Sequence, residues 1–582
     1  MKATEAKLLE FLKKSSQFII PIYQRTYSWT DWECGQLWDD IVRAGESDST
    51  NAHFVGSIVY VEKGLYQVTS GAPLLVIDGQ QRLTTVTLLL EAIARAVGDD
   101  EPVEGFSAKK IRNYYLLNDL ESGEKRFKLL LSQNDKSTLL ALLDQKAFPP
   151  EFSIRIKENF ELLEKWLLEY PKHLPLLCKG LGKIIVVDIS LNRDQDNPQL
   201  IFESMNSTGL ALSQADLIRN FVLMAQEPNE QTRLYQDYWR PMEERFGQEA
   251  YEWAFDGFMR HYLTLKTGRI PKIDGVYREF KTYLATQETG IEPLLASIHG
   301  HAGYYAAMAL DQEEDPDLAA AFSDLRELQV DVAYPLLLEL YSAYSQTTLT
   351  KSDFLAALRT IEAYVLRRAV CGVPTNMLNK VFAAFPQNLD SANYLESMKA
   401  HIVSLTSRSR FPDNAEYEHG LKTNYLYGTR ALKFLLRRIE NRGRKEPVSV
   451  AAFTIEHILP QNENLSPEWQ AELGPEWQRI RETWLHTLGN LTLTGYNSEY
   501  KDHPFAVKCS IPGGFAESPL RLNQGLAQLA AWNEKAILER ADRLASESLS
   551  IWSMPQPSPA FVKNAAAQVA VAEDEELEDN DQ

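Results

Sequence analysis

The chain has few cysteines and no long apolar run, and each absence excludes a class of protein. Its four cysteines lie far apart, with no Cys-x-x-Cys pair. A disulfide framework and a thiolate zinc site are therefore not expected. No run of about 18 apolar residues exists, so no membrane span or membrane partner is predicted. The amphipathic start, MKATEAKLLEFLKKSS, is not a secretory signal. We expect a cytoplasmic protein.

The chain also lacks an excess of positive charge. Its formal net charge is −20. Broad, non-specific adhesion to nucleic acid is disfavoured, because such adhesion depends on neutralising phosphates with Lys and Arg. Seven of the acidic residues lie in the last ten positions, 573–582, so part of the charge is local. A DNA enzyme of this charge must therefore concentrate its basic residues in a groove.

The length of 582 residues predicts about three or four domains. A hydrophobic content of 44% with 24% charged residues is that of an ordinary globular protein. The periodicities predict a mostly helical α+β chain. We expect an N-terminal α+β domain over 1–225, a helical connector over 226–400, a C-terminal domain over 401–555 and a disordered acidic tail over 556–582.

Aromatic side chains cluster after the first predicted helix, which spans residues 5–18. Pro21 ends that helix, and a second helix is predicted from Trp32 to Ile41. The cluster could form a small aromatic core with a stacked arginine. It could instead pack rings and a guanidinium against a nucleotide or a phosphate. Its members are Tyr23, Arg25, Tyr27, Trp29, Trp32 and Trp38.

A polar motif, Asp-Gly-Gln-Gln-Arg at 78–82, lies between a predicted strand and a predicted helix. A helix N-terminus presents free amide donors to anions. Arg82 would add a bidentate phosphate donor, and Asp78 could hold a magnesium ion or a ribose hydroxyl. The alternative is that Asp78 caps the helix and Arg82 pairs with a neighbour. A turn at Asn206 is expected to face the same strand end.

Residues 427–445, called the basic strip here, are rich in Lys and Arg. An amphipathic helix would place the leucines of this strip inward and its basic side chains outward. The strip is therefore the best candidate for a DNA-facing surface. Its outward residues include Lys433, Arg437 and Arg438. Arg367 and Arg368, on another predicted helix, are expected to form a solvated face or ion pairs rather than to contact DNA.

Glu456 and His457 lie side by side in a predicted strand that stops at Pro460. A second strand is predicted within 488–495 and a helix after it. Phosphodiester cleavage needs a base that activates water and a hard cation that neutralises charge at the phosphate. A histidine suits the base, because its ordinary pKa lies near neutrality. In a regular strand Glu456 would point away from His457, unless a bulge turns it inward.

Three segments of the N-terminal region, IPIYQRTYSW, VIDGQQRLTT and IFESMNSTGLALSQADLIRN, resemble the DUF262 domain over about residues 8–225. The resemblance implies a ParB-like core that binds and hydrolyses a nucleoside triphosphate, such as GTP or ATP. It also implies catalytic roles for Asp78 and Arg82. The implied nucleotide-binding residues are Tyr23, Gln24, Arg25, Asp78, Gly79, Gln80, Gln81, Arg82 and Asn206.

The C-terminal segments TIEHILPQ and LGNLTLTGYN resemble DUF1524, an HNH-like ββα-metal nuclease domain, over about 400–553. This domain follows DUF262 in single-chain GmrSD-type, modification-dependent type IV restriction endonucleases. The resemblance implies that His457 is the general base and that Asn490 orients His457 or ties the loop. Glu456 and Asn497 would bind Mg²⁺ or Mn²⁺, with His486 and His503 as alternatives. Lys501 and Lys508, together with Lys433, Arg437 and Arg438, would contact DNA.

The resemblance to these two domains implies a phage-defence endonuclease that cleaves modified double-stranded DNA. The N-terminal domain would sense a nucleotide and the modification, and the C-terminal domain would cut. Hypermodified cytosine is the expected modification. The alternative is a nucleotide-gated DNA-binding regulator or nickase, one that could sense phosphorothioate DNA. A homodimer is a further expectation that the sequence does not fix.

Overall fold

The computed structural model describes residues 2–49, 52–62, 73–191, 196, 199, 201–203 and 212–567. The chain divides into two compact units. The first unit comprises Met1–Pro241 and Thr289–Leu295, and the second comprises Met242–Glu288 and Ala296–Gln582. Residues 296–400 of the predicted connector thus belong to the same unit as the C-terminal region. The mostly helical α+β class is confirmed.

A six-stranded mixed sheet forms the centre of the first unit, in the order β1-β6-β3-β4-β2-β5. Strand β3 runs antiparallel to β4 and parallel to β6. The strand predicted before the Asp-Gly-Gln-Gln-Arg motif is therefore present as β4. The strands are β1 (Lys2–Lys7), β2 (Phe18–Ile19), β3 (His53–Glu62), β4 (Leu74–Asp78), β5 (Leu129–Leu130) and β6 (Ile184–Leu191).

The helix predicted over 5–18 is wrong at both ends. Lys2–Lys7 form an edge strand that pairs antiparallel with β6. Helix α1 covers only Leu8–Lys14, and β2 begins at Phe18. The side chains of β1 are mostly exposed, so this strand needs no buried apolar face, and its sequence shows no alternation of apolar and polar residues. Backbone pairing with β6, rather than a local pattern, decides its structure.

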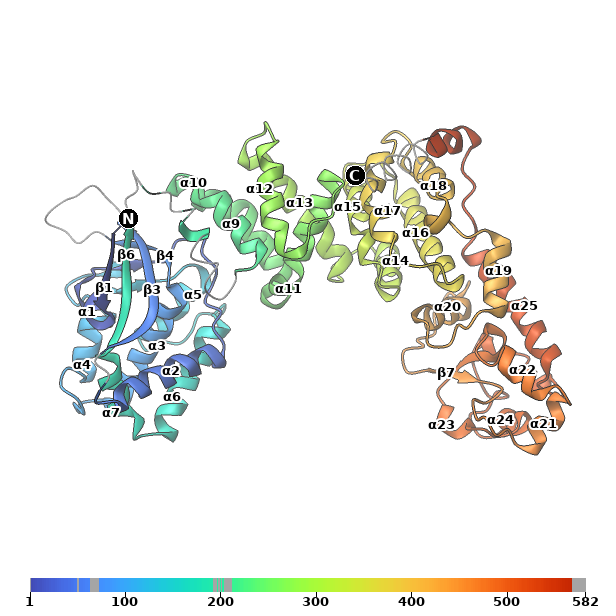
Figure 1. The fold of residues 1–582 in the computed structure, drawn as a ribbon, viewed down its shortest axis with the longest axis horizontal. Helices are drawn as coiled ribbons and strands as arrows, with labels where there is room; N and C mark the ends of the chain where they lie inside the picture. The colour runs from blue at the N-terminus through green and yellow to red at the C-terminus, as the bar shows by residue number, and fades with distance from the viewer. Residues whose placement is uncertain are drawn as a thin grey trace. The chain divides into compact units, whose positions relative to one another are not determined.

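Helices pack against the sheet of the first unit (Figure 1). Helices α2 and α7 approach closely at Gly45 and Gly180, where a Cβ atom would lie 2.1 Å from Leu176 O and 1.9 Å from Ile41 O. A smaller apolar cluster joins β3, β4 and β6 to Leu217 and Met224 of α9. The helices are α2 (Asp31–Glu46), α3 (Gln80–Val97), α4 (Ala108–Ile111), α5 (Gln133–Leu143), α6 (Ile154–Glu169), α7 (His173–Leu181), α9 (Gln214–Met224) and α10 (Pro228–Leu234).

The second unit is helical up to its C-terminal region. The chain passes between the units within α11 (Arg240–Thr267), between Glu288 and Thr289, and within α13 (Ile291–Ala309). The other helices of this part are α12 (Val276–Ala285), α14 (Pro316–Glu327), α15 (Tyr334–Ser345), α16 (Lys351–Val370), α17 (Leu378–Ala384), α18 (Tyr394–Ser404), α19 (Asn414–Thr423) and α20 (Arg430–Asn441).

A two-stranded antiparallel sheet lies in the C-terminal region of the second unit. Strand β7 (Thr454–His457) pairs with β8 (Leu491–Thr494), and the short helix α23 (Asn497–Tyr500) follows. The predicted order of strand, strand and helix is therefore present. Around it lie α21 (Pro467–Leu473), α22 (Trp477–Trp484), α24 (Phe505–Ser510) and α25 (Glu534–Ile551), which Figure 1 shows near β7.

The region predicted as a disordered tail contains a helix over 559–567, and residues 568–582 lie outside the described residues. Ala565 of this helix is buried, and Ser404 donates a hydrogen bond to the carbonyl of Val562. Within the described part of the chain, no helix is long and apolar enough to cross a membrane.

Candidate active site

A pocket of about 320 Å³ lies at the end of β7. It brings the predicted base and the adjacent predicted metal ligand Glu456 together with Asn497 and Lys501, which lie about 40 positions later in the sequence. The pocket is lined by Tyr427, Ile455, Glu456, His457, Pro460, Gln461, Asn462, Asn497, Lys501 and Asp502.

His457 is buried at the wall of this pocket. Its Nε2 lies 3.0 Å from Nδ1 of His486, and the Tyr427 ring meets its ring edge-on at 4.4 Å. Burial, together with the nearby His486 and Lys508, lowers the pKa of His457 to about 3. The imidazole is therefore neutral near pH 7 and retains a lone pair that can accept a proton.

Asn490 is fully buried and does not line the pocket. Its Oδ1 accepts from the amide of Leu459 (2.7 Å) and from Nε1 of Trp532 (3.0 Å). Its Nδ2 donates to the carbonyls of Leu459 (3.0 Å) and Leu485 (2.9 Å). All hydrogen-bonding positions of the Asn490 side chain are thus occupied by groups in the protein interior. The catalytic assignment is corrected: Asn490 ties the loop after β7, which was one of its two expected roles.

Glu456 forms a buried ion pair with Lys508. The Lys508 Nζ lies 2.5 Å from Glu456 Oε1 and donates to the carbonyl of His457 at 2.9 Å. Burial raises the pKa of the Glu456 carboxyl, and the Lys508 ammonium opposes that rise. The β7–β8 register is continuous, so no bulge redirects Glu456. The predicted DNA contact of Lys508 is wrong, because its side chain is 0% exposed.

Asn497 and Lys501 are exposed at the mouth of the pocket. Asn497 Nδ2 donates to the carbonyl of Ile455 (3.0 Å) and to Thr454 Oγ1 (3.2 Å). Its Oδ1 accepts no hydrogen bond from the described residues, so it can face a cation. Lys501 adds a positive charge beside it, and its predicted contact with DNA stays a prediction.

Asp502 also lines the pocket, and sequence reasoning missed it. Its Oδ2 accepts a hydrogen bond from Asn462 Nδ2 at 2.9 Å, which lowers the pKa of Asp502. The position follows Lys501 in a polar stretch between two short helices. No spacing rule distinguishes this carboxylate from other exposed acids. Only the folded loop places it next to Asn462.

The pocket suits a hydrated, hard cation better than a closed metal site. Among the residues that the structure describes, no group of three or more His, Cys, Asp and Glu side chains is placed to hold a metal ion. The side-chain oxygen donors that line it include Glu456, Asn497 and Asp502. Mg²⁺ keeps several waters and needs only one or two protein carboxylates. The residues present therefore fit Mg²⁺ or Mn²⁺, and not a structural zinc ion.

The basic strip forms helix α20, but two of its arginines face acids of the same unit. Arg437 pairs with Asp324 (2.7 Å) and Arg438 with Asp324 (2.9 Å) and Glu362 (3.3 Å). Burial raises the pKa of Asp324, but the guanidinium groups of Arg438, Arg359 and Arg437 outweigh it and lower the pKa. The predicted DNA contacts of Arg437 and Arg438 are therefore wrong.

Lys433, on the same helix, donates to the carbonyl of Ala451 at 3.2 Å, and its predicted contact with DNA stays a prediction.

Arg367 and Arg368 are almost completely buried. Arg367 donates to the carbonyls of Trp552 and Pro412, and Arg368 donates to those of Arg408 and Pro374. The expected solvated face is wrong, because backbone carbonyls satisfy these guanidinium groups inside the unit.

In the first unit, the Asp-Gly-Gln-Gln-Arg motif occupies the predicted strand-to-helix junction. Strand β4 ends at Asp78, Gly79 adopts φ +95°, and α3 begins at Gln80. Gly79 is the N-cap residue, and among the described residues no side chain caps this helix, so the alternative in which Asp78 caps the helix is wrong. The Arg82 Nη1 donates to the carbonyl of Ser57 at 2.7 Å. Burial lowers the pKa of Arg82, and the charge of Asp78 opposes this.

The glutamines of the motif fasten the aromatic segment to α3. Gln80 Nε2 donates to the carbonyl of Arg25 (3.0 Å). Gln81 donates to Thr26 O (3.1 Å) and accepts from the amide of Ser28 (2.9 Å). Gln24 Nε2 donates to Ile77 O at 2.8 Å. These contacts favour the aromatic-core alternative over a side-chain surface for a nucleotide.

Burial supports that alternative. Tyr23 and Tyr27 are each 5% exposed, and Trp38 belongs to the main core. Trp32, by contrast, is 62% exposed. Asn206, a predicted nucleotide-binding residue, lies outside the described residues. Nucleotide contact by any of these residues therefore stays a prediction.

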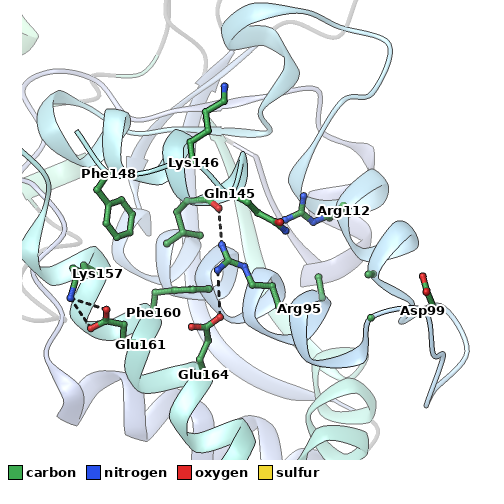
Figure 2. A pocket seen from close by; sticks show the side chains of 14 residues that line it. Arg95, Asp99, Arg112, Gln145, Lys146, Phe148, Lys157, Phe160, Glu161 and Glu164 are labelled. Carbon is green, nitrogen blue, oxygen red and sulfur yellow. Dashed lines mark hydrogen bonds and ion pairs between the residues drawn. The ribbon is translucent and has the colours of Figure 1, made fainter. Parts of the chain in front are cut away.

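A larger cavity, of about 660 Å³, lies at the other end of α3 (Figure 2). Arg95 lies over the Phe160 ring at 4.6 Å and donates to the carbonyl of Leu142 at 2.8 Å. Arg112, Phe148 and Glu164 also line it. Helix α3 has 18 residues and is about 27 Å long. None of the motif residues lines this cavity, and no motif in the sequence pointed to it.

Two family models match the chain. Residues 8–223 match the N-terminal domain of the GmrSD restriction endonuclease, and residues 411–547 match the C-terminal domain of GmrSD restriction endonucleases. No curated protein matches it. The two stretches keep the order of the two domains and together cover more than half of the chain. They define a restriction endonuclease, a class of enzyme that acts on DNA.

The chain belongs to the GmrSD family and carries both domains in one polypeptide. The resemblance noted from its sequence motifs is thereby confirmed. The pocket beside β7 lies within the stretch matched by the C-terminal domain, and the Asp-Gly-Gln-Gln-Arg junction lies within the stretch matched by the N-terminal domain.

Proposed function

We propose that the chain is a metal-dependent, HNH-type endonuclease of phage defence that cleaves modified double-stranded DNA in the pocket beside β7. One observation carries the proposal: a neutral His457 stands at the wall of a pocket lined by oxygen donors, within the GmrSD C-terminal domain. A base and a set of hard-cation ligands in one pocket are what hydrolysis of a phosphodiester requires.

In this proposal His457 accepts a proton from a water molecule, and the resulting hydroxide attacks the phosphorus. The bond between phosphorus and the leaving sugar oxygen breaks, and that oxygen takes up a proton from solvent. Asn497, Asp502 and the Glu456 carboxylate would hold Mg²⁺ or Mn²⁺ through oxygen atoms. When bound, the cation would neutralise the charge that develops at the phosphate. Lys501 stands at the exposed side of the pocket, where it would attract the DNA backbone.

The first unit would bind a nucleoside triphosphate, GTP or ATP, and sense the DNA modification. Support comes from the match to the GmrSD N-terminal domain and from the N-terminus of α3, which no side chain of the described residues caps. The first-turn amides of α3 can meet a phosphate even though the side chains of Gln80 and Gln81 bond elsewhere. A cytoplasmic location and a homodimer remain predictions.

The proposal is tested with the full chain, Mg²⁺ or Mn²⁺ and GTP or ATP. The substrates are phage DNA with glucosylated hydroxymethylcytosine, phosphorothioate DNA and unmodified DNA. We expect cleavage of modified DNA that His457→Ala abolishes. His503→Ala is the matched control, because His503 is exposed and does not line the pocket. If His457→Ala cleaves as well as the parent, the assignment of the base is wrong.

A nucleotide-gated DNA-binding regulator or nickase is the second candidate. One observation favours it: Lys508 already neutralises Glu456, which reduces the charge available to hold a cation. Phosphate release with and without DNA, measured beside nicking of supercoiled plasmid, separates the two candidates. Nicked circles without linear product would support the nickase.

A further inference from the structure

We propose that His486 is a positioning residue for the reaction, and that it fixes which nitrogen of His457 can act as the base. In this arrangement His457 Nε2 donates its hydrogen to His486 Nδ1, and the lone pair of His457 Nδ1 remains for the attacking water. The inference rests on the proposed function of His457 as the base. It gives His486 a role other than the alternative metal ligand expected from the sequence.

The two imidazoles are held in a defined geometry. His457 Nε2 and His486 Nδ1 are 3.0 Å apart, and the ring planes are nearly perpendicular, at 87°. At 3.0 Å one nitrogen must carry a hydrogen and the other must offer its lone pair. The contact therefore couples the tautomers of the two rings.

His486 is itself fixed by the segment that precedes α20. The amides of Leu426 and Tyr427 donate to its backbone carbonyl, at 2.9 and 3.4 Å. The Tyr427 ring stacks against its imidazole, with an interplanar angle of 20° and centroids 5.4 Å apart. The Tyr425 ring lies 4.5 Å away. Backbone and ring contacts together set the direction of His486 Nδ1, so this nitrogen is a fixed partner for His457.

Only one of the two tautomer pairs leaves His457 able to accept a proton. If His486 Nδ1 carried the hydrogen, it would donate a hydrogen bond to the lone pair of His457 Nε2. The neutral His457 ring would then carry its own hydrogen on Nδ1 and would have no lone pair left for a water molecule. If His457 Nε2 carries the hydrogen, Nδ1 is the acceptor. A general base needs a lone pair, so catalysis requires the second pair.

The same hydrogen bond strengthens as the reaction proceeds. When His457 Nδ1 takes the proton from water, the ring becomes an imidazolium and its Nε2–H becomes a charged donor to His486. Hydrogen bonds from ionised donors are about twice as strong as neutral ones. An interaction that is stronger in the transition state than in the ground state raises kcat. His486 is therefore expected to affect kcat more than KM.

The first experiment compares His486→Asn, His486→Gln and His486→Leu in the full chain, with Mn²⁺ and the modified phage DNA that the parent cleaves. Asn places an amide acceptor at the position of Nδ1, whereas Gln places it one bond farther out. We expect His486→Leu and His486→Gln to lower kcat by about 10- to 100-fold with KM little changed. We expect His486→Asn to stay within a few-fold of the parent. Equal activity of the Asn and Leu variants would overturn the inference.

The second experiment needs no cleavage. Imidazole ¹⁵N spectra of the deuterated full chain, labelled at histidine, report the tautomer of each ring. Loss of signals in His457→Gln and His486→Asn assigns the two residues. We expect His457 in the Nε2–H form. The Nδ1–H form at His457 would refute this inference whatever the parent cleaves. If the parent shows the expected tautomer but His457→Ala cleaves normally, His457 is not the base.

Discussion

The two polar motifs of this chain make different uses of their side chains. In the first unit, Gln24, Gln80 and Gln81 bond to backbone groups of neighbouring segments, and the larger cavity lies at the far end of α3. In the second unit, His457 and Asn497 line a pocket. A motif whose polar side chains bond to the backbone of neighbouring segments stabilises the fold. A motif whose polar groups converge on a cavity can perform chemistry.

The comparison also separates residues within the second motif. Asn490 and Lys508 serve the interior, as the glutamines of the first unit do, whereas Asn497 and Asp502 face the pocket. Two asparagines seven positions apart therefore have different functions. Substitutions that remove one kind of contact should lower stability, and those that remove the other should lower activity.

The largest effect is expected for Lys508→Met. It leaves the Glu456 carboxylate buried without its cation, and breaking a buried ion pair in this way destabilises by about 3–5 kcal/mol. The measurement is thermal unfolding of the full chain. The double variant Lys508→Met with Glu456→Gln should recover most of the loss, because no uncompensated charge remains. If the double variant is no more stable than the single one, the ion pair does not explain the burial of Lys508.

Asn490→Ala should lower the stability of the second unit by about 3 kcal/mol, because it leaves buried partners such as the Trp532 Nε1 without hydrogen bonds. Asn497→Ala is the matched control: the side chain is exposed, so stability should change by less than about 0.5 kcal/mol. We expect Asn497→Ala to weaken Mn²⁺ binding, measured by calorimetry. A stable Asn490→Ala protein would remove the distinction between the two asparagines.

Gln81→Ala tests the first unit. It removes two hydrogen bonds that hold the segment 26–28, which should lower stability by about 1–3 kcal/mol. Gln36→Ala, at an exposed position of α2, should change little. The two compact units need not unfold together, so the transition must be assigned to the first unit in a thermal scan. Unchanged stability with lost nucleotide binding would mean that this motif too serves chemistry.

Arg438→Gln should destabilise the second unit by about 1–2 kcal/mol, because Asp324 keeps Arg359 and Arg437 as partners while Glu362 loses one. Lys433→Gln, on the same helix, should leave stability unchanged. If Lys433 contacts DNA, this variant should reduce the salt dependence of DNA affinity by about one unit of log–log slope. If Arg438→Gln instead reduced the salt dependence of DNA affinity and Lys433→Gln lowered stability, Arg438 would be the residue that contacts DNA.

The sequence by itself determined the helical connector, the strand-to-helix junction at 78–82, the order strand, strand and helix around His457, and the family. These features follow from local periodicity, from turn residues and from motifs whose letters are contiguous. The family matches at both ends of the chain confirm the motifs. A local pattern of residues reflects interactions between residues that are close in the sequence, and these features depend on such interactions.

Only the tertiary structure decided the roles of the charged and polar residues. Lys508 lies 52 positions from Glu456, and Arg437 lies 113 positions from Asp324. His486 meets His457 across 29 positions. Whether a lysine or arginine faces solvent, DNA or a buried acid depends on such distant partners, which no window of sequence contains. The same holds for β1, whose polar residues form a strand because β6 offers them hydrogen bonds.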